Sequence, residues 1–441
     1  MRTEPARALC FRAVAKTVFA GSLTGRSVSR CAGRFLLPVV VTAILLSGGG
    51  CLSKKADKHA QQESPLRPDG YEAAPSEWDP ADDPQPYGAA ETRSFAEARS
   101  DRAVIQVFYG TDRAPTGSAE PNEFYGSDRG RIQLGLCEVS IPRNHVEGEL
   151  ESPKIWKLEF SEDVEKHVVL TSVEPLNGRT FLAGMRQTIQ ATEAREAFIF
   201  IHGYNVTFRD AARRTAQIAY DLKFDGAPIM YSWPAQGALK DYSVDEENAR
   251  WSVPNVTRFV EGIAQASGAR KVHLIAHSMG NRVLTGALHR LANEYPTGDG
   301  PRFNEVVLTA PDIDADTFKR DIAPFITQSA DRVTIYASSN DKALLASRAL
   351  HGNTRLGLAG DYLTTFPDLS NVEVIDASEV DTSLFSLGHS YYGSNTTVLG
   401  DLRSLFRGRA AAARGLAAHQ VPAAWLLRLQ QAGAGSDLRR N

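Results

Sequence analysis

The most informative segment of the chain is residues 271–284, which read Lys-Val-His-Leu-Ile-Ala-His-Ser-Met-Gly-Asn-Arg-Val-Leu. The apolar run before Ser278 is typical of a buried strand, and the apolar residues of 281–293 recur at helical spacing. Ser278 is therefore predicted to lie on a tight turn between strand and helix, with its hydroxyl at the edge of a sheet. The small residues Ala276 and Gly280 allow the strand and the helix to approach closely. Ala276 stands where such turns usually have glycine, and one extra methyl group is tolerable there.

Short apolar runs alternate with stretches of helical spacing along residues 103–402. Further strands are predicted at Val104–Tyr109, Leu134–Ile141, His167–Val173, Phe198–Ile201, Ile229–Trp233, Val306–Thr309, Val333–Ala337 and Val372–Ile375. Helices are predicted at Val206–Leu222 and Val244–Ala266, the second kinked or broken at Pro254. Apolar strands that alternate with helices indicate a mostly parallel central sheet flanked by helices. With the serine turn, this order predicts the α/β-hydrolase fold, preceded by a β-rich N-terminal extension over 103–190.

Two backbone N–H groups are candidates for an oxyanion hole. Ester hydrolysis develops negative charge on an oxygen, and each preorganised donor to it is worth about 3 kcal/mol. The N–H of Met279 directly follows the serine at the start of a helix. The second candidate is the N–H of Tyr204, in the segment His-Gly-Tyr-Asn (residues 202–205) that follows a predicted strand.

Four residues around these donors are predicted to support the site. Gly203 allows close approach of the backbone, as Gly280 does on the other side. We expect His202 to brace its loop rather than to take part in the chemistry. His277, next to the serine, is predicted to have a supporting role as well.

A serine hydroxyl needs a base to remove its proton, and in this fold the chain order is serine, acid, histidine. The histidines that follow Ser278 are His289, His351, His389 and His419. His289 lies within the helix after the turn, and His419 lies in an Ala/Arg-rich tail. His389 follows the last predicted strand after a loop, so it is the predicted base.

The predicted acid is Asp341. It directly follows the strand predicted at 333–337, the last but one, which is the usual position of the acid in this fold. Asp312 follows the preceding strand and is the alternative acid, and its other interpretation is a helix cap or a loop hydrogen-bonder. Asp376 also follows a predicted strand, but that strand is the final one, after which the loop that contains His389 should begin.

The N-terminus has the parts of an export segment. Arginines precede the apolar run Phe35–Leu46, which is followed by Ser-Gly-Gly-Gly-Cys51. The run is about a dozen residues, shorter than the ~20 that span a bilayer. Residues 1–51 resemble a bacterial lipoprotein signal with lipidation at Cys51, although Gly48 replaces the usual leucine. A cleaved signal and an uncleaved anchor are the alternatives, and all three place the folded domain at the cell envelope, on the periplasmic or another extracytoplasmic side.

The remaining segments carry weaker signals. Residues 52–102 are rich in Pro, Asp, Glu, Ala and Ser, so they are predicted to be a disordered linker. Residues 403–441 form a basic, Ala-rich tail that is predicted to be partly helical, near Pro422–Gln431.

Composition excludes several classes of function. The net charge of −3 and the lack of a basic block argue against nucleic-acid binding. The four cysteines form no CxxC pair or Cys/His cluster, so no metal and no cofactor is predicted. Cys137 is the single cysteine in the predicted folded region, which excludes an internal disulfide there, and it is expected to be a small buried hydrophobe.

Taken together, these motifs resemble a bacterial family of α/β-hydrolases of unknown function, often described as esterase/lipase-superfamily lipoproteins. The matching stretches, within about residues 103–392, are 107–113, 135–145, 200–205, 276–280, 310–314, 339–344, 355–357 and 388–390. The resemblance implies an α/β-hydrolase fold with a triad of Ser278, Asp341 and His389, and it implies no particular substrate.

The leading functional hypothesis is a serine hydrolase that cleaves small-molecule or lipid carboxylic esters through an acyl-enzyme on Ser278. An acyltransferase or a thioesterase would use the same triad. A catalytically silent binding or scaffold protein of the envelope is the alternative from a different class, because a fold alone does not establish activity. The expected partners are an ester substrate and, through the N-terminal anchor, a membrane.

Overall fold

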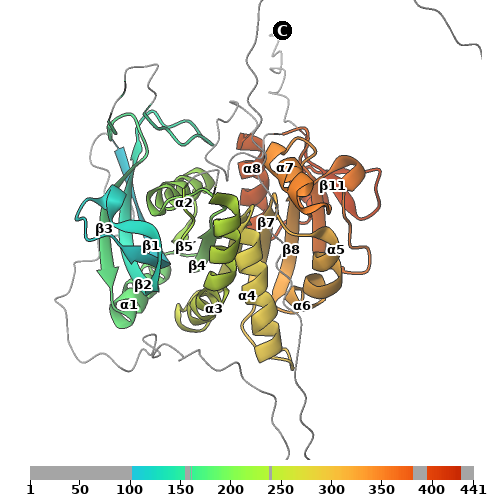
Figure 1. Cartoon of the computed structure of the whole chain (residues 1–441), viewed down its shortest axis with the longest axis horizontal. Helices are drawn as coiled ribbons and strands as arrows, with labels where there is room; N and C mark the ends of the chain where they lie inside the picture. The colour runs from blue at the N-terminus through green and yellow to red at the C-terminus, as the bar shows by residue number, and fades with distance from the viewer. Residues whose placement is uncertain (1–101, 154–158, 160, 238–240, 381–394, 429–441) are drawn as a thin grey trace, which may run out of the picture. The chain divides into compact units, whose positions relative to one another are not determined.

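One mostly parallel sheet organises the molecule (Figure 1). The computed structural model describes residues 102–153, 159, 161–237, 241–380 and 395–428, all within the compact unit Ala73–Asn441. Across these residues eleven strands lie in the order β10-β11-β9-β8-β7-β6-β4-β5-β1-β2-β3. Their bounds are β1 Arg102–Pro115, β2 Tyr125–Pro142, β3 Val169–Leu176, β4 Glu196–Ile201, β5 Gly226–Ser232, β6 Lys271–His277, β7 Phe303–Thr309, β8 Ala330–Ala337, β9 Val372–Asp376, β10 Ala417–Ala418 and β11 Ala424–Leu426.

The β-rich extension belongs to this same sheet. β2 pairs antiparallel with both β1 and β3, while β1 runs parallel to β5. From β5 to β11 every neighbouring pair is parallel, and β10 closes the far edge antiparallel to β11. Every predicted strand is present, although β1 and β2 are longer than predicted.

Helices cover both faces of the sheet. The α-helices are α1 Gly178–Gln190, α2 Phe208–Leu222, α3 Tyr242–Ala266, α4 Gly280–Glu294, α5 Ala315–Thr317, α6 Ala323–Ile326, α7 Lys342–His351 and α8 Asn395–Phe406. Buried side chains of α1, α3 and α4 share one core with the sheet, and those of α2 and α8 pack on the other face. Figure 1 shows α3 and α4 side by side in front of the strands.

The central strands are apolar throughout because both of their faces are buried. On β4, Ile199 and Ile201 point to the core under α3 and α4, while Phe198 and Phe200 point to the core under α2 and α8. This is the two-residue period of a strand. Each fully buried side chain of this size contributes about 1.5–3 kcal/mol to folding. Packing on both faces therefore holds the central strands firmly in place, together with the loops that follow their carboxyl ends.

The predicted break at Pro254 is wrong. α3 continues through Pro254 from Tyr242 to Ala266. Proline removes one intrahelical hydrogen bond, but Phe259 and Ile263 beyond it are fully buried and hold the second half of the helix on the sheet.

The helix predicted near Pro422–Gln431 is also wrong. Ala424–Leu426 form β11, which pairs with Val374–Asp376 of β9. Helix α8 crosses the predicted boundary at residue 402 and ends at Phe406. An Ala-rich composition favours a helix locally, but hydrogen bonds to the open edge of β9 outweigh that preference here.

Part of the sequence interpretation concerns residues outside the described ones. The export segment with Cys51, the linker up to residue 101 and the segment with His389 all lie there, while Arg102, the last residue of the predicted linker, begins β1. Within the described ranges, no helix has both the length and the apolar composition that crossing a bilayer requires.

Candidate active site

Ser278 occupies a strained bend between β6 and α4. Its φ is 49°, in the left-handed region that residues with a Cβ rarely adopt. Its N–H donates to the Thr309 carbonyl of β7 at 3.0 Å, and its carbonyl accepts from the backbone and the side-chain N–H of Asn281 at 3.1 and 3.0 Å. The serine is 7% exposed. The neighbouring strand and the first turn of α4 therefore hold the bend in place.

Two further residues with positive φ lie, like Ser278, at the carboxyl ends of the central strands. Asn205 follows β4 with a φ of 59°, and Ala310 follows β7 with a φ of 44°. With Ser278 after β6, these three residues end three neighbouring parallel strands. Strained residues that cluster at the carboxyl ends of parallel strands are characteristic of functional sites.

Two glycines bring the loop after β4 against the serine bend. A Cβ on Gly203 would lie 3.1 Å from the Ser278 Cβ, and a Cβ on Gly280 would lie 2.3 Å from the His202 carbonyl oxygen. The contact with backbone at 2.3 Å requires glycine at position 280, whereas at position 203 a Cβ would force its neighbours to shift by a few tenths of an ångström. Residues 202–205 are thereby held beside the serine.

The two candidate oxyanion donors make no hydrogen bond to other residues that the structure describes. Neither the backbone N–H of Tyr204 nor that of Met279 donates to any described residue. Met279 lies at the N-terminus of α4, where the helix dipole favours negative charge.

Both predicted supporting histidines are buried. His202 stacks on Trp233, with ring centroids 5.1 Å apart. Burial and the charge of Arg113 lower the pKa of His202 well below its ordinary value. Burial, with the charge of Arg214, lowers the pKa of His277 to about 3. Both rings are therefore neutral at neutral pH.

Asp341 caps helix α7 at the carboxyl end of β8. Its side chain accepts from the N–H of Leu344 at 2.9 Å. Burial raises the pKa of Asp341, the N–H groups of Leu344 and Ala343 partly offset that rise, and the nearby Asp312 adds to it. The carboxyl group is half-buried at the same sheet edge as Ser278.

The loop of Asp341 is bonded to the loop that leaves β9. Ser378 accepts from the N–H of Ser339 at 2.8 Å through its hydroxyl, and from the side-chain amide of Asn340 at 2.7 Å through its carbonyl. The segment 381–394, which contains His389, comes three residues further along the chain, outside the described residues.

Asp312 has many partners. Its buried carboxylate accepts from the hydroxyls of Tyr242 and Ser347, the second at 2.6 Å. The guanidinium groups of Arg282 and Arg355 lie 3.4 and 3.7 Å from it. Asp312 thus connects the loop after β7 to α3, α4 and α7, which is the contact pattern of a loop hydrogen-bonder and leaves little room for an imidazole.

The other downstream histidines have partners away from Ser278. His351 ends α7 and bonds Glu246 at 2.9 Å, His289 of α4 packs on Phe325 of α6, and His419 lies 3.4 Å from Asp376. Among the described residues, no group of three or more His, Cys, Asp or Glu side chains could hold a metal ion.

The sequence interpretation gave no role to two buried charged residues beneath the loops. Asp245 of α3 accepts from the N–H of Asn205 at 3.0 Å and from that of Gln236 at 2.7 Å, so it joins the loops after β4 and β5. Arg113 of β1 donates to carbonyls of the same two loops, Val206 at 2.7 Å and Ala235 at 3.0 Å. Arg113 is the last residue of the motif 107–113, so the sequence pointed to it as a residue of interest. Asp245 lies in none of the motifs, and no sequence pattern pointed to it.

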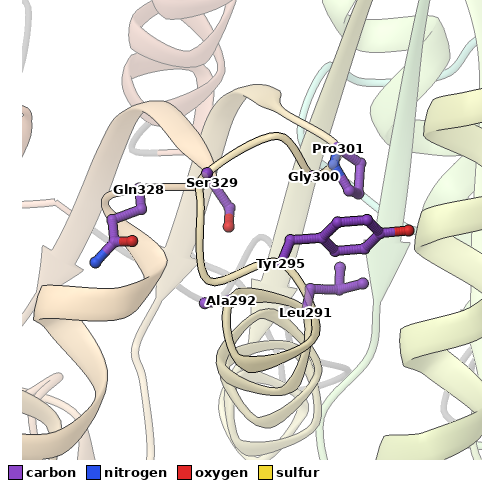
Figure 2. A pocket seen from close by; sticks show the side chains of 8 residues that line it. Leu291, Ala292, Tyr295, Gly300, Pro301, Gln328 and Ser329 are labelled. Atoms are coloured by element: carbon purple, nitrogen blue, oxygen red, sulfur yellow. The ribbon is translucent and has the colours of Figure 1, made fainter.

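A shallow hollow lies at the opposite end of α4 from Ser278 (Figure 2). Leu291 and Tyr295 line it from the helix, and Gln328 and Ser329 line it from the segment before β8. The hollow therefore lies near the amino ends of the strands, away from the edge where ligands bind in parallel sheets.

The sheet order and the serine bend define an α/β hydrolase. More particularly, residues 180–409 match the family described as alpha/beta hydrolases of unknown function (DUF900), and the chain belongs to that family.

Two individual proteins are also similar to this chain. An uncharacterized protein of Nostoc sp. (strain PCC 7120), alr1448, is 26% identical over 201 residues, which cover 39% of this chain and 51% of the relative. The chain thus matches about half the length of that relative. A crystal structure described as a "putative cell surface hydrolase" from Lactobacillus plantarum WCFS1 is similar over 49% of this chain and 92% of that one, at 10% identity and a TM-score of 0.30.

Proposed function

We propose that this chain is a serine hydrolase that cleaves carboxylic esters through an acyl-enzyme on Ser278. The observation that carries the proposal is the strained serine bend with the loop 202–205 packed against it. A left-handed serine costs conformational energy to maintain, and we infer that this bend holds the Ser278 hydroxyl beside the backbone N–H groups of Tyr204 and Met279.

In the proposed reaction the Ser278 hydroxyl attacks the ester carbonyl carbon while His389 takes its proton. The resulting oxyanion accepts hydrogen bonds from the N–H groups of Tyr204 and Met279. The intermediate then expels the alcohol, which receives the proton from His389, and Ser278 stays acylated. Water, activated by the same histidine, releases the acid and restores the serine.

We assign the orienting acid to Asp341. The carboxylate of Asp312 is engaged by two hydroxyls and lies near two guanidinium groups, so it is poorly placed to accept from an imidazole. The Asp341 loop is bonded to the chain that leaves β9, three residues before the segment that contains His389.

We further propose that the enzyme acts at the cell envelope, held to the membrane through Cys51, on small-molecule or lipid esters. Support for this comes from the basic flank, the short apolar run and the small residues before Cys51.

The test is covalent labelling of the full chain with a fluorophosphonate probe. We expect labelling of the wild type and none of Ser278→Ala. Ser329→Ala is a matched control, because Ser329 is 8% exposed and lines the hollow at the other end of α4. It should label like the wild type. A folded wild type that does not label would refute the proposal and favour a silent binding protein.

A further inference from the structure

A line of hydrogen bonds runs from a buried arginine to the loop beside Ser278. The Nε–H of Arg113 donates to the Ser232 hydroxyl at 2.9 Å. That hydroxyl lies 3.2 Å from Nε2 of His202, and Nδ1 of His202 lies 2.8 Å from the Gly203 carbonyl oxygen. All three side chains are at most 1% exposed, so water does not compete for these bonds.

Chemistry fixes the direction of each bond. The Gly203 carbonyl can only accept, so Nδ1 of His202 carries a proton. Since the buried ring is neutral, its Nε2 holds a lone pair and must accept from Ser232. The Ser232 hydroxyl has one proton, which it donates to His202, and it accepts from Arg113, whose guanidinium can only donate. Arg113, Ser232 and His202 thus form a chain of donors that ends at the Gly203 carbonyl.

The last bond of this chain orients the peptide group that carries one of the two proposed oxyanion donors. The Gly203 carbonyl and the Tyr204 N–H belong to one planar trans peptide, in which they point in opposite directions. A carbonyl held toward His202 therefore turns the Tyr204 N–H away from His202. Glycine leaves this peptide free to rotate, and the opposite orientation would present a carbonyl oxygen to the oxyanion instead of a donor.

Arg113 is suited to anchor the chain. Its other N–H groups donate to the carbonyls of Gly126, Ala235 and Val206 at 2.7–3.0 Å. These three contacts hold the planar guanidinium group in place, so its Nε–H can point only toward Ser232. Burial lowers the pKa of Arg113 to about 10, so it stays charged at neutral pH and keeps the pKa of His202 low.

We propose that Arg113, Ser232 and His202 are positioning residues that hold the Tyr204 N–H in its oxyanion-binding orientation. This inference rests on the proposed function of Ser278 and deepens it.

The first test compares two substitutions of His202 in the full chain. His202→Asn keeps a side-chain N–H near the place of Nδ1, whereas His202→Leu fills the space without a donor. With p-nitrophenyl butyrate, we expect Leu to lower kcat roughly 10²- to 10³-fold, the effect of one lost oxyanion donor, and to leave KM within about threefold. Asn should stay within about tenfold of the wild type. If packing alone mattered, the smaller Asn would be no better than Leu, and equal losses would overturn the proposal.

The second test extends to Ser232 and adds an NMR measurement that needs no activity. Ser232→Ala should lower kcat with KM unchanged, and an unchanged kcat would remove Ser232 and Arg113 from the chain. NMR of the full chain with ¹⁵N-labelled histidine should show His202 neutral with its proton on Nδ1, assigned by the loss of that signal in His202→Asn. A proton on Nε2 would overturn the proposal. Because probe labelling of Ser278 is scored separately, failure of the proposed function is distinguishable from failure of the hydrogen-bond chain.

Discussion

Replacement of His145 should remove a pH-dependent part of the stability. Both ring nitrogens of His145 lie 2.8 Å from a carboxylate oxygen, Nδ1 from Glu151 and Nε2 from Asp221. Two carboxylates can both be satisfied only by a ring with two protons, so the folded protein binds the charged form. Burial alone lowers the pKa of His145, but the bonds and charges of Asp221 and Glu151 outweigh it and raise the pKa to about 9.

The magnitude follows from that pKa. The ordinary value is 6.5 and the folded value is about 9, and at 1.36 kcal/mol for each pKa unit the difference is at most about 3 kcal/mol. Because the folded pKa is the higher one, this stabilisation is complete below about pH 6.5 and is lost as the pH rises through about 9.

The assay is denaturant unfolding of the full chain between pH 6 and pH 9.5. The free energy of unfolding of the wild type should exceed that of His145→Gln by up to about 3 kcal/mol at the acidic end, and the gap should close toward the alkaline end. His289→Gln serves as a control, because the His289 ring of α4 packs on Phe325 of α6, and it should follow the wild type. A constant gap between the wild type and His145→Gln across this range would refute the reasoning.

Three further predictions concern the site and the anchor. Asp341→Asn should lower kcat by roughly 10³- to 10⁴-fold, whereas Asp312→Asn should lower the free energy of unfolding by about 3 kcal/mol and spare most of the turnover. Steady-state ester hydrolysis and denaturant unfolding measure both effects, and the reverse ranking in kcat would transfer the acid role to Asp312. Gly280→Ala should unfold or inactivate the protein because its Cβ meets the His202 carbonyl, while Gly400→Ala in α8, with nothing within 4 Å of the new Cβ, should keep full activity and melt at the same or a higher temperature. Metabolic labelling with a fatty-acid analogue should mark the protein and disappear in Cys51→Ala, and labelling that persists would exclude lipidation at this cysteine.

The sequence predicts the central strands well because both faces of these strands are buried, so each strand is a run of consecutive apolar residues. Helix α1 was not predicted, although Phe181, Leu182, Met185 and Ile189 recur at helical spacing and are buried. Its N-cap, Asn177, accepts from the N–H of Thr180 and was a readable start signal. Strand β11 is different, because three residues form a strand only through the edge of β9, which no local pattern can reveal.

The candidate site shows the same division. The serine bend is readable from spacing, because its strand, its serine and its helix follow one another within a few residues. The contacts of Gly203 with Ser278 and of Gly280 with His202 join segments far apart in the sequence, and only the position of each glycine beside a predicted strand or helix pointed to them. The partners of Asp312 come from α3, α4, α7 and the segment after α7. The donor to His202 is Ser232 of β5, which in turn accepts from Arg113 of β1. Such networks depend on which distant segments the fold brings together, so one sequence does not disclose them.

The C-terminal strands have a practical consequence for any shortened form of this protein. β11 hydrogen-bonds along β9, and Arg414 reaches Glu373 at 2.7 Å and Asp401 at 3.4 Å. A protein terminated at residue 402 would expose the main-chain groups of Val374–Asp376 to other molecules, and unpaired strand edges of this kind promote aggregation. Recombinant versions that retain the residues through 428 should stay monodisperse where the shorter version precipitates.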